Sequence, residues 1–84
     1  MRLAELKRRL RVGTRVELIN PRSPRQAGVR EVSRVQTNAV AFRNADGRES
    51  WLDFPTAKHL SGTPTGFIIH DPEDSDFTLE YAWR

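Results

Sequence analysis

The side chains with the most chemical potential in this sequence are the bases near its beginning. Guanidinium and ammonium groups neutralise phosphates and release the counterions around nucleic acids, and arginine can grip a phosphate through two parallel hydrogen bonds. The bases that could act in this way stand at positions 7–11 and in a proline-containing segment at 20–28. They are Lys7, Arg8, Arg9, Arg11, Arg22 and Arg25. This pattern predicts contact with DNA or RNA, and a solvated or protein-binding face is the alternative interpretation.

Charge is divided unevenly along the chain. Residues 1–34 hold ten bases and three acids, whereas residues 35–84 hold four bases and eight acids, and the whole chain carries a formal charge of +3. A basic first half of this kind indicates an acidic partner. The acidic segment at 71–76 has the opposite sign, so it could meet a basic partner or the helix of another copy. Plain solubility is the simpler interpretation of that segment.

Trp51 is the aromatic residue with the clearest second interpretation. The alternating stripe at 77–83 is expected to pack inward, as is Phe42 beside Val40. Trp51 instead shares a strand face with Asp53 in the sequence Ser-Trp-Leu-Asp. Either this ring belongs to the core, or Trp51 and Asp53 form a binding surface for a partner protein.

The sequence carries no recognisable constellation for catalysis or metal binding. It has no cysteine and two histidines, His59 and His70, whereas a zinc site needs three or four ligands at defined spacing. Its serines lack a nucleophile elbow, and no phosphate-binding glycine motif is found. The acids at 71–76 do not follow the pattern of a calcium loop. We therefore expect a non-enzymatic binding module with no catalytic residue, no metal and no cofactor.

A short helix is expected to position the first group of bases. Leu3, Leu6 and Leu10 recur at steps of three and four residues, which predicts an amphipathic basic helix over residues 1–12 that Gly13 ends as its C-cap. The bases crowd the C-terminal turn of this helix, where the helix dipole favours cations. Part of the basic run therefore has a purely structural explanation.

Short strands and tight turns fill residues 13–84. Alternating or β-branched runs predict six strands, at 14–19, 29–35, 38–43, 48–54, 67–70 and 77–83. The pattern further predicts a bulge within 29–35, a hairpin turn at 44–47, a single helical turn at 56–60 that Thr56 caps, and a loop at 61–66. We expect a single, mostly β domain over residues 1–84. A small SH3-like antiparallel barrel is favoured because closure removes exposed edges, and a strongly twisted sheet of five to six strands is the alternative.

Three segments in the middle of the chain resemble small hypothetical proteins encoded by phages and mobile elements. They are 12–18, 32–42 with the motif VQTNA, and 50–57 with the motif SWLDFP. The resemblance implies a related fold and a phage-like origin, and it carries no active site. The alternative function is a phage-type protein–protein adaptor or inhibitor that acts on a host complex, with Trp51 as its anchor and the acidic segment at 71–76 as its rim.

Composition also predicts where the protein acts. Charged residues interrupt the apolar residues of the N-terminal segment, unlike the core of a signal peptide. No stretch approaches the ~20 apolar residues that a membrane span needs. We expect a cytoplasmic protein, in a cell or an infected host, with no membrane partner, and the sequence favours no particular oligomeric state.

Overall fold

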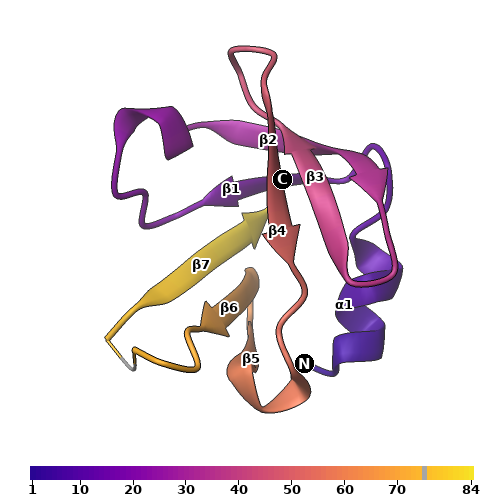
Figure 1. Ribbon diagram of the computed structural model, residues 1–84, viewed down its shortest axis with the longest axis vertical. Coiled ribbons are helices and arrows are strands. Elements are labelled where there is room, and N and C mark those ends of the chain that lie inside the picture. The colour runs from indigo at the N-terminus through magenta and orange to yellow at the C-terminus, as the bar shows by residue number, and fades with distance from the viewer. Residues whose placement is uncertain (75) are drawn as a thin grey trace.

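The computed structural model describes residues 1–74 and 76–84, with the side chain of Arg25 also left out. This part of the chain forms one α-helix and one antiparallel sheet of seven strands (Figure 1). The elements are α1 (Leu3–Arg9), β1 (Arg15–Leu18), η1 (Pro24–Gln26), β2 (Val29–Val35), β3 (Ala39–Arg43), β4 (Glu49–Asp53), η2 (Ala57–His59), β5 (Leu60–Thr63), β6 (Gly66–His70) and β7 (Thr78–Trp83). The two η elements are single turns of 3-10 helix.

The strand order β4-β3-β2-β1-β7-β6-β5 joins two three-stranded meanders through β1. β1 pairs with β2 on one side and with β7 on the other. The outermost strands, β4 and β5, do not pair with each other among the described residues, so the predicted closure into a barrel is wrong. The alternative, an open and strongly twisted sheet, agrees with the observed architecture.

The strand count is also a correction, because the sheet has seven strands where five to six were predicted. The additional strand is β5, in a segment whose Ser, Gly, Thr and Pro residues predicted a loop. It forms by backbone pairing with β6, from Leu60 opposite Ile69 to Thr63 opposite Gly66, across a tight turn. Leu60 alone among its side chains is buried. Local composition therefore could not reveal this strand, whose stability comes from its partner.

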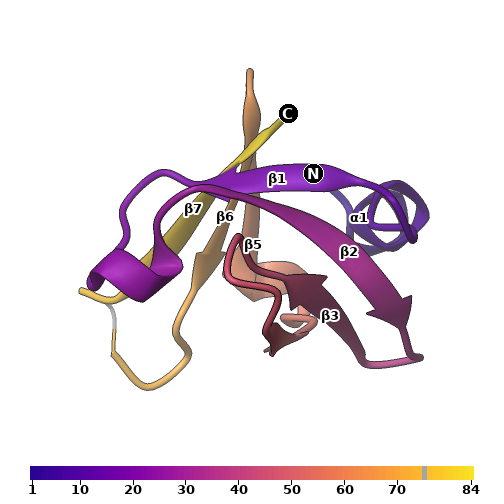
Figure 2. The ribbon, with the colours of Figure 1, turned by 90° about the horizontal axis from the view of Figure 1, so that it is seen from above.

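Aromatic rings hold the sheet in a rolled shape. Phe42 of β3 and Tyr81 of β7 are separated in the sheet by β2 and β1, and a flat sheet would hold those strands about 14 Å apart. Their ring centroids lie 5.9 Å from each other, and the ring of Phe67 stacks on Tyr81 at 5.0 Å. All three side chains are buried. The sheet therefore curls around its own core (Figure 2).

Helix α1 packs on this core through Leu6 and Leu10, which are fully buried. It is shorter than the predicted 1–12, because the α-helix ends at Arg9 and Leu10 is its C-cap. Thr14 rather than Gly13 satisfies the end of the helix, since the Thr14 hydroxyl donates to the Arg9 carbonyl oxygen at 2.8 Å. Gly13 instead has a φ of 95° in the turn that leads into β1.

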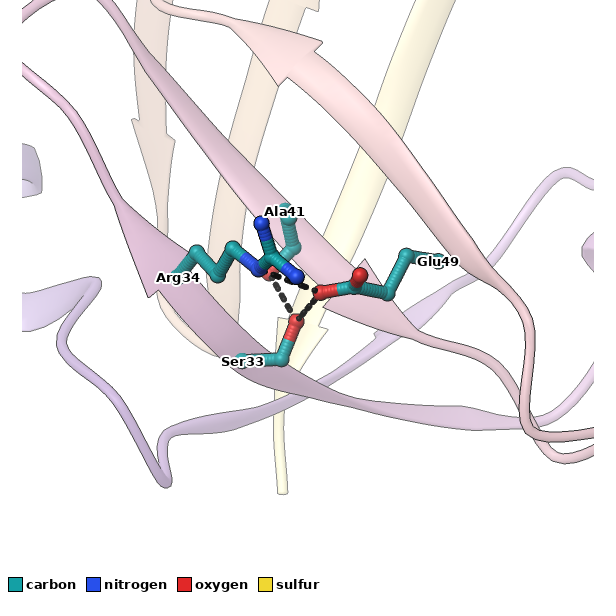
Figure 3. Close-up of polar contacts among 4 residues, drawn as sticks. All are labelled: Ser33, Arg34, Ala41 and Glu49. Carbon is teal, nitrogen blue, oxygen red and sulfur yellow. Dashed lines mark hydrogen bonds and ion pairs between the residues drawn. The ribbon is translucent and has the colours of Figure 1, made fainter.

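Two local features that the sequence predicts are confirmed. Gly47 has a φ of 85° in the turn at 44–47 between β3 and β4. The pairing of β2 with β3 shifts between Val32 and Arg34, which is the predicted bulge. Near it the Ser33 hydroxyl donates to the Glu49 carboxylate at 2.6 Å, and the Arg34 guanidinium lies 3.3 Å from the same oxygen (Figure 3). A short turn at Ala57–His59 also forms, as a 3-10 helix without a side-chain cap from Thr56.

Strands β6 and β7 approach each other so closely at Gly66 that a side chain has no room there. A Cβ atom at this position would lie 1.7 Å from the backbone oxygen of Tyr81, which cannot move without breaking the strand pairing. We expect Gly66→Ala to lower the free energy of unfolding by about 3 kcal/mol or more, measured by urea denaturation. In the matched control Gly62→Ala, the added atom would meet the side chain of Met1 at 3.0 Å. A loss above about 1 kcal/mol in that control, or equal losses in the two variants, would contradict this packing.

Candidate functional site

The basic face of α1 is fixed by the burial of the opposite side of the helix. Leu6 and Leu10 are held in the core, so the bases between and after them lie on the outside. The four predicted contact residues of this segment, Lys7, Arg8, Arg9 and Arg11, are all exposed. Lys7, Arg8 and Arg9 lie on α1 and Arg11 follows its C-cap, and these four bases form the basic face of α1.

Two of these bases also pack on aromatic rings. The Lys7 ammonium lies 5.3 Å from the ring centroid of Phe54, and the Arg9 guanidinium lies 3.9 Å from that of Trp83. Such cation–π contacts contribute about 0.5–1 kcal/mol each at exposed sites. Lys7 and Arg9 thus help to dock the helix, whereas Arg8 and Arg11 have no such contact in the described structure.

Acidic side chains neutralise arginines of the sheet and its turns but none of α1. The ion pairs among the described residues are Arg15–Glu31 at 3.5 Å, Arg34–Glu49 at 3.3 Å, Arg48–Asp46 at 4.0 Å and Arg84–Glu17 at 3.0 Å. All four of these arginines lie outside the helix. Arg30 and Arg43 of the sheet have no ion pair either, but the densest group of bases without one in the described structure lies on and directly after α1.

The second predicted group of bases lies at the other end of the molecule. The segment that contains η1 and helix α1 stand at opposite ends in both views (Figures 1 and 2). The Arg22 guanidinium lies 4.3 Å from the ring centroid of Phe77, and the Arg22 backbone amide donates to Gln26. The side chain of Arg25 falls outside the described structure. The fold does not bring Arg22 next to the bases of α1.

The predicted partner-binding residues, Trp51 and Asp53, lie on edge strand β4. Both are exposed and separated by the half-buried Leu52, so they share the outward face of the strand. Trp51 keeps 49% of its surface exposed and pairs with the small residue Ala41 of β3. The interpretation of this ring as a core residue is therefore wrong, and its role in binding a partner stays a prediction.

His70 and the start of the acidic turn have hydrogen-bond partners within the fold. The His70 ring nitrogen Nε2 lies 3.0 Å from the Ser61 hydroxyl on the neighbouring strand. The Asp71 carboxylate accepts from the backbone amides of Glu73 and Asp74 and so shapes the start of the turn. Residues 1–74 and 76–84 contain no group of three or more metal-ligating side chains.

Arg30 is the residue of most interest that the sequence analysis missed. It stands opposite Val16 in the β1–β2 pair and points to the same inward face as Val32. Only 7% of its surface is exposed, and its Nε atom has no hydrogen-bond partner in the described structure. No described residue forms a hydrogen bond or an ion pair with the Arg30 guanidinium. Counting back in steps of two from Val32 would have placed Arg30 inward, whereas the three-residue spacing of the valines drew attention to Val29.

A groove of about 430 Å³ opens beside Arg30 on the concave face of the sheet. It runs between β4 and the segment that contains η1, and its volume falls in the range of small-molecule sites. Its lining is mixed. The apolar and aromatic members are Leu18, Phe42, Trp51, Leu52, Leu79 and Tyr81, and the polar members besides Arg30 are Ser23, Gln26, Asn44, Asp46, Arg48, Glu49 and Ser50. Arg30 is the buried charged residue in this lining.

Tyr81 shares the interior of the groove with Arg30. Burial raises the pKa of the Tyr81 phenol above its ordinary value of 10.0, and the positive charge of Arg30 offsets part of this rise. A positive charge beside a phenol favours its ionised form, so Arg30 and burial act on Tyr81 in opposite directions. Arg30 and Tyr81 are buried together in a groove whose lining also holds polar and charged side chains, among them Asn44, Asp46 and Arg48.

A scan against protein-family models, a search of curated proteins and a search of solved structures found no match. No helix among the described residues has the length and apolar character needed to cross a membrane. The candidate sites therefore depend on the geometry alone. These are the basic face of α1, the exposed Trp51 and the groove beside Arg30.

Replacement of Arg30 by an apolar side chain should stabilise the fold. Burial of an unpaired charge is costly, so we expect Arg30→Met to raise the free energy of unfolding by about 1–3 kcal/mol in urea denaturation. Arg15→Met is the matched control, because Arg15 lies on the adjacent strand in an exposed ion pair, and it should change stability by less than about 1 kcal/mol. A loss of stability in Arg30→Met would show that the guanidinium has partners in the fold.

The titration of Tyr81 provides a direct probe of the groove, because the chain has a single tyrosine. Its pKa is raised in the folded chain, so its contribution to stability is complete below pH 10 and is lost as the pH rises through the folded pKa. Phenolate absorbance should reach half its final value at a higher pH in the native chain than in guanidinium chloride. Arg30→Met should move the native midpoint higher still. Identical midpoints in the folded and unfolded chains would contradict the burial of the phenol.

Proposed function

We propose that the protein is a non-enzymatic binding module that contacts nucleic acid through the basic face of α1. The observation that supports this most is the distribution of ion pairs. Carboxylates partner four arginines outside the helix, whereas the described structure has no ion pair on α1. An uncompensated cluster of bases on a docked helix is suited to phosphate contact.

Within this proposal the helix bases have different roles. Arg8 and Arg11 contact phosphates, because no aromatic contact occupies them in the described structure. Lys7 and Arg9 add charge beside them and keep the helix on the sheet. Arg22 and Arg25 belong to a separate contact at the other end of the molecule. Phosphate contacts of this kind position a protein without reading base sequence, so we propose little sequence specificity.

The proposal includes three features that come from the sequence. They are an SH3-like relationship of the sheet, a phage-like origin and a cytoplasmic location. The short antiparallel strands that curl around one core support the first of these. The resemblance of the middle segments supports the second, and the composition supports the third.

Removal of two helix bases should weaken nucleic-acid binding. We expect Arg8→Gln/Arg11→Gln to weaken binding at least about tenfold at about 50 mM salt and to reduce the salt slope by about two. Fluorescence anisotropy with labelled duplex DNA and labelled single-stranded RNA measures both quantities. Neither side chain contributes to the core, so the variant should keep the stability of the parent.

The control for this experiment is Arg43→Gln/Arg48→Gln, which removes the same charge at the β3–β4 turn. That turn projects away from α1 (Figure 1). The control should bind more tightly than the helix variant. Equal weakening of the two variants would show that net charge rather than the helix face drives binding. Absence of binding by the parent chain at low salt would reject the nucleic-acid function.

The exposed Trp51 favours a second candidate, a phage-type adaptor or inhibitor of a host protein complex. A tryptophan that keeps 49% of its surface exposed on an edge strand is a suitable anchor for a protein interface. Asp53 and the acidic turn would form the polar rim. Trp51→Ala separates the two functions, since it leaves the nucleic-acid anisotropy unchanged and removes the anchor of the protein contact.

A further inference from the structure

The groove beside Arg30 contains a charge that the described fold does not compensate. Arg30 is buried as a residue, its Nε atom has no hydrogen-bond partner, and no ion pair reaches its guanidinium within the described structure. Such a group destabilises a fold unless an anion supplies acceptors for its nitrogens. Its position in the wall of an open groove gives a ligand access to it.

The acidic side chains that line the same pockets as Arg30 have other partners. Glu31 pairs with Arg15, and the Glu49 carboxylate is bound by Ser33 and Arg34 (Figure 3). Asp46 accepts from the Arg48 backbone amide at 2.9 Å and is therefore turned into its own hairpin turn. The protein's own carboxylates thus leave the Arg30 guanidinium to an external acceptor.

The chemistry of the groove selects the kind of acceptor. A planar guanidinium matches a carboxylate through two parallel hydrogen bonds. Arg30 supplies a single buried positive charge, and the lining also holds the carboxylates of Asp46 and Glu49. A monoanion is therefore neutralised by Arg30, whereas a dianionic phosphate would place a second negative charge near these carboxylates. The Tyr81 phenol stays neutral up to alkaline pH and supplies a second polar group. Phe42, Leu52 and Leu79 provide an apolar surface beside this polar centre.

We propose that this groove is a binding site for a small monocarboxylate, with the carboxylate on Arg30 and its apolar body against Phe42, Leu52 and Leu79. The site is independent of the nucleic-acid contact on α1, because α1 does not contribute to its lining. It gives a function to a buried charge at a position where an apolar residue would stabilise the fold.

Titrations followed by 1H–15N NMR spectra of the whole chain test the proposal. The probes are phenylacetate, indole-3-acetate and octanoate. Phenylacetamide, which is neutral, and phenyl phosphate, which carries more negative charge, are control ligands that keep the phenyl ring. We expect at least one carboxylate to shift the amide signals of Leu18, Phe42 and Tyr81 with a Kd of about 1 mM or below. Phenylacetamide and phenyl phosphate should bind at least about tenfold more weakly than phenylacetate. Absence of shifts with all three carboxylates up to about 10 mM, or equal binding of the amide, would overturn the proposal.

Variants connect the binding to Arg30 itself. Arg30→Met should weaken carboxylate binding at least about tenfold while its spectrum remains that of a folded chain. Arg15→Met, on the adjacent strand, should bind like the parent. Undiminished binding in Arg30→Met, or tighter binding of phenyl phosphate than of phenylacetate, would overturn the assignment. Arg30→Met should keep full nucleic-acid affinity, so a failure of this proposal is distinguishable from a failure of the proposed function.

Discussion

The ring of Tyr81 packs between Phe42 of β3 and Phe67 of β6, and the rest of the structure depends on this contact. β1 joins the two meanders only at their inner edges, by pairing with β2 and β7. Backbone pairing alone would leave the meanders free to splay apart. The three rings attach the concave face of one meander to that of the other, so the sheet buries a common core. Trp83 extends the cluster through its contact with Phe67, and the Arg9 guanidinium of the helix packs on the Trp83 ring.

The same contact explains why the sheet holds a groove. A closed barrel would fill its interior and bring its edge strands together. Here β4 and β5 stay unpaired with each other in the described structure, and the rings fill only part of the concave face. Arg30 lies at the boundary between the packed and the open part, where its stem is covered and its charge has no acceptor from the fold. The open groove, the burial of Arg30 and its lack of an acceptor therefore all follow from the partial closure of the sheet.

Features that depend on local periodicity could be predicted from the sequence, and features that depend on pairing across the sheet could not. The amphipathic helix, the turn that contains Gly47 and the bulge in β2 each follow from residues close together in the chain. β5 depends on β6, and the open edges depend on the roll of the whole sheet. The sequence did not predict the burial of Arg30 because the bulge breaks the alternation of β2. The valines of this strand recur every three residues, whereas the inward positions Arg30 and Val32 are two residues apart. The inward direction of Arg30 is settled by its pairing with Val16.

The fold also changes what the uneven charge of the sequence means. The sheet places strands from the basic first half beside strands from the acidic second half, and two ion pairs, Arg84–Glu17 and Arg34–Glu49, connect the halves. Within the sheet the asymmetry is therefore largely cancelled by neighbours. Segments outside the sheet, namely α1, the connection at 20–28 and the turn at 71–76, have no ion pair among the described residues and keep the charge of their sequence. A charged partner is attracted over long range by charge that has no neighbouring counter-charge. We therefore expect these segments, rather than a basic and an acidic half of the molecule, to attract charged partners.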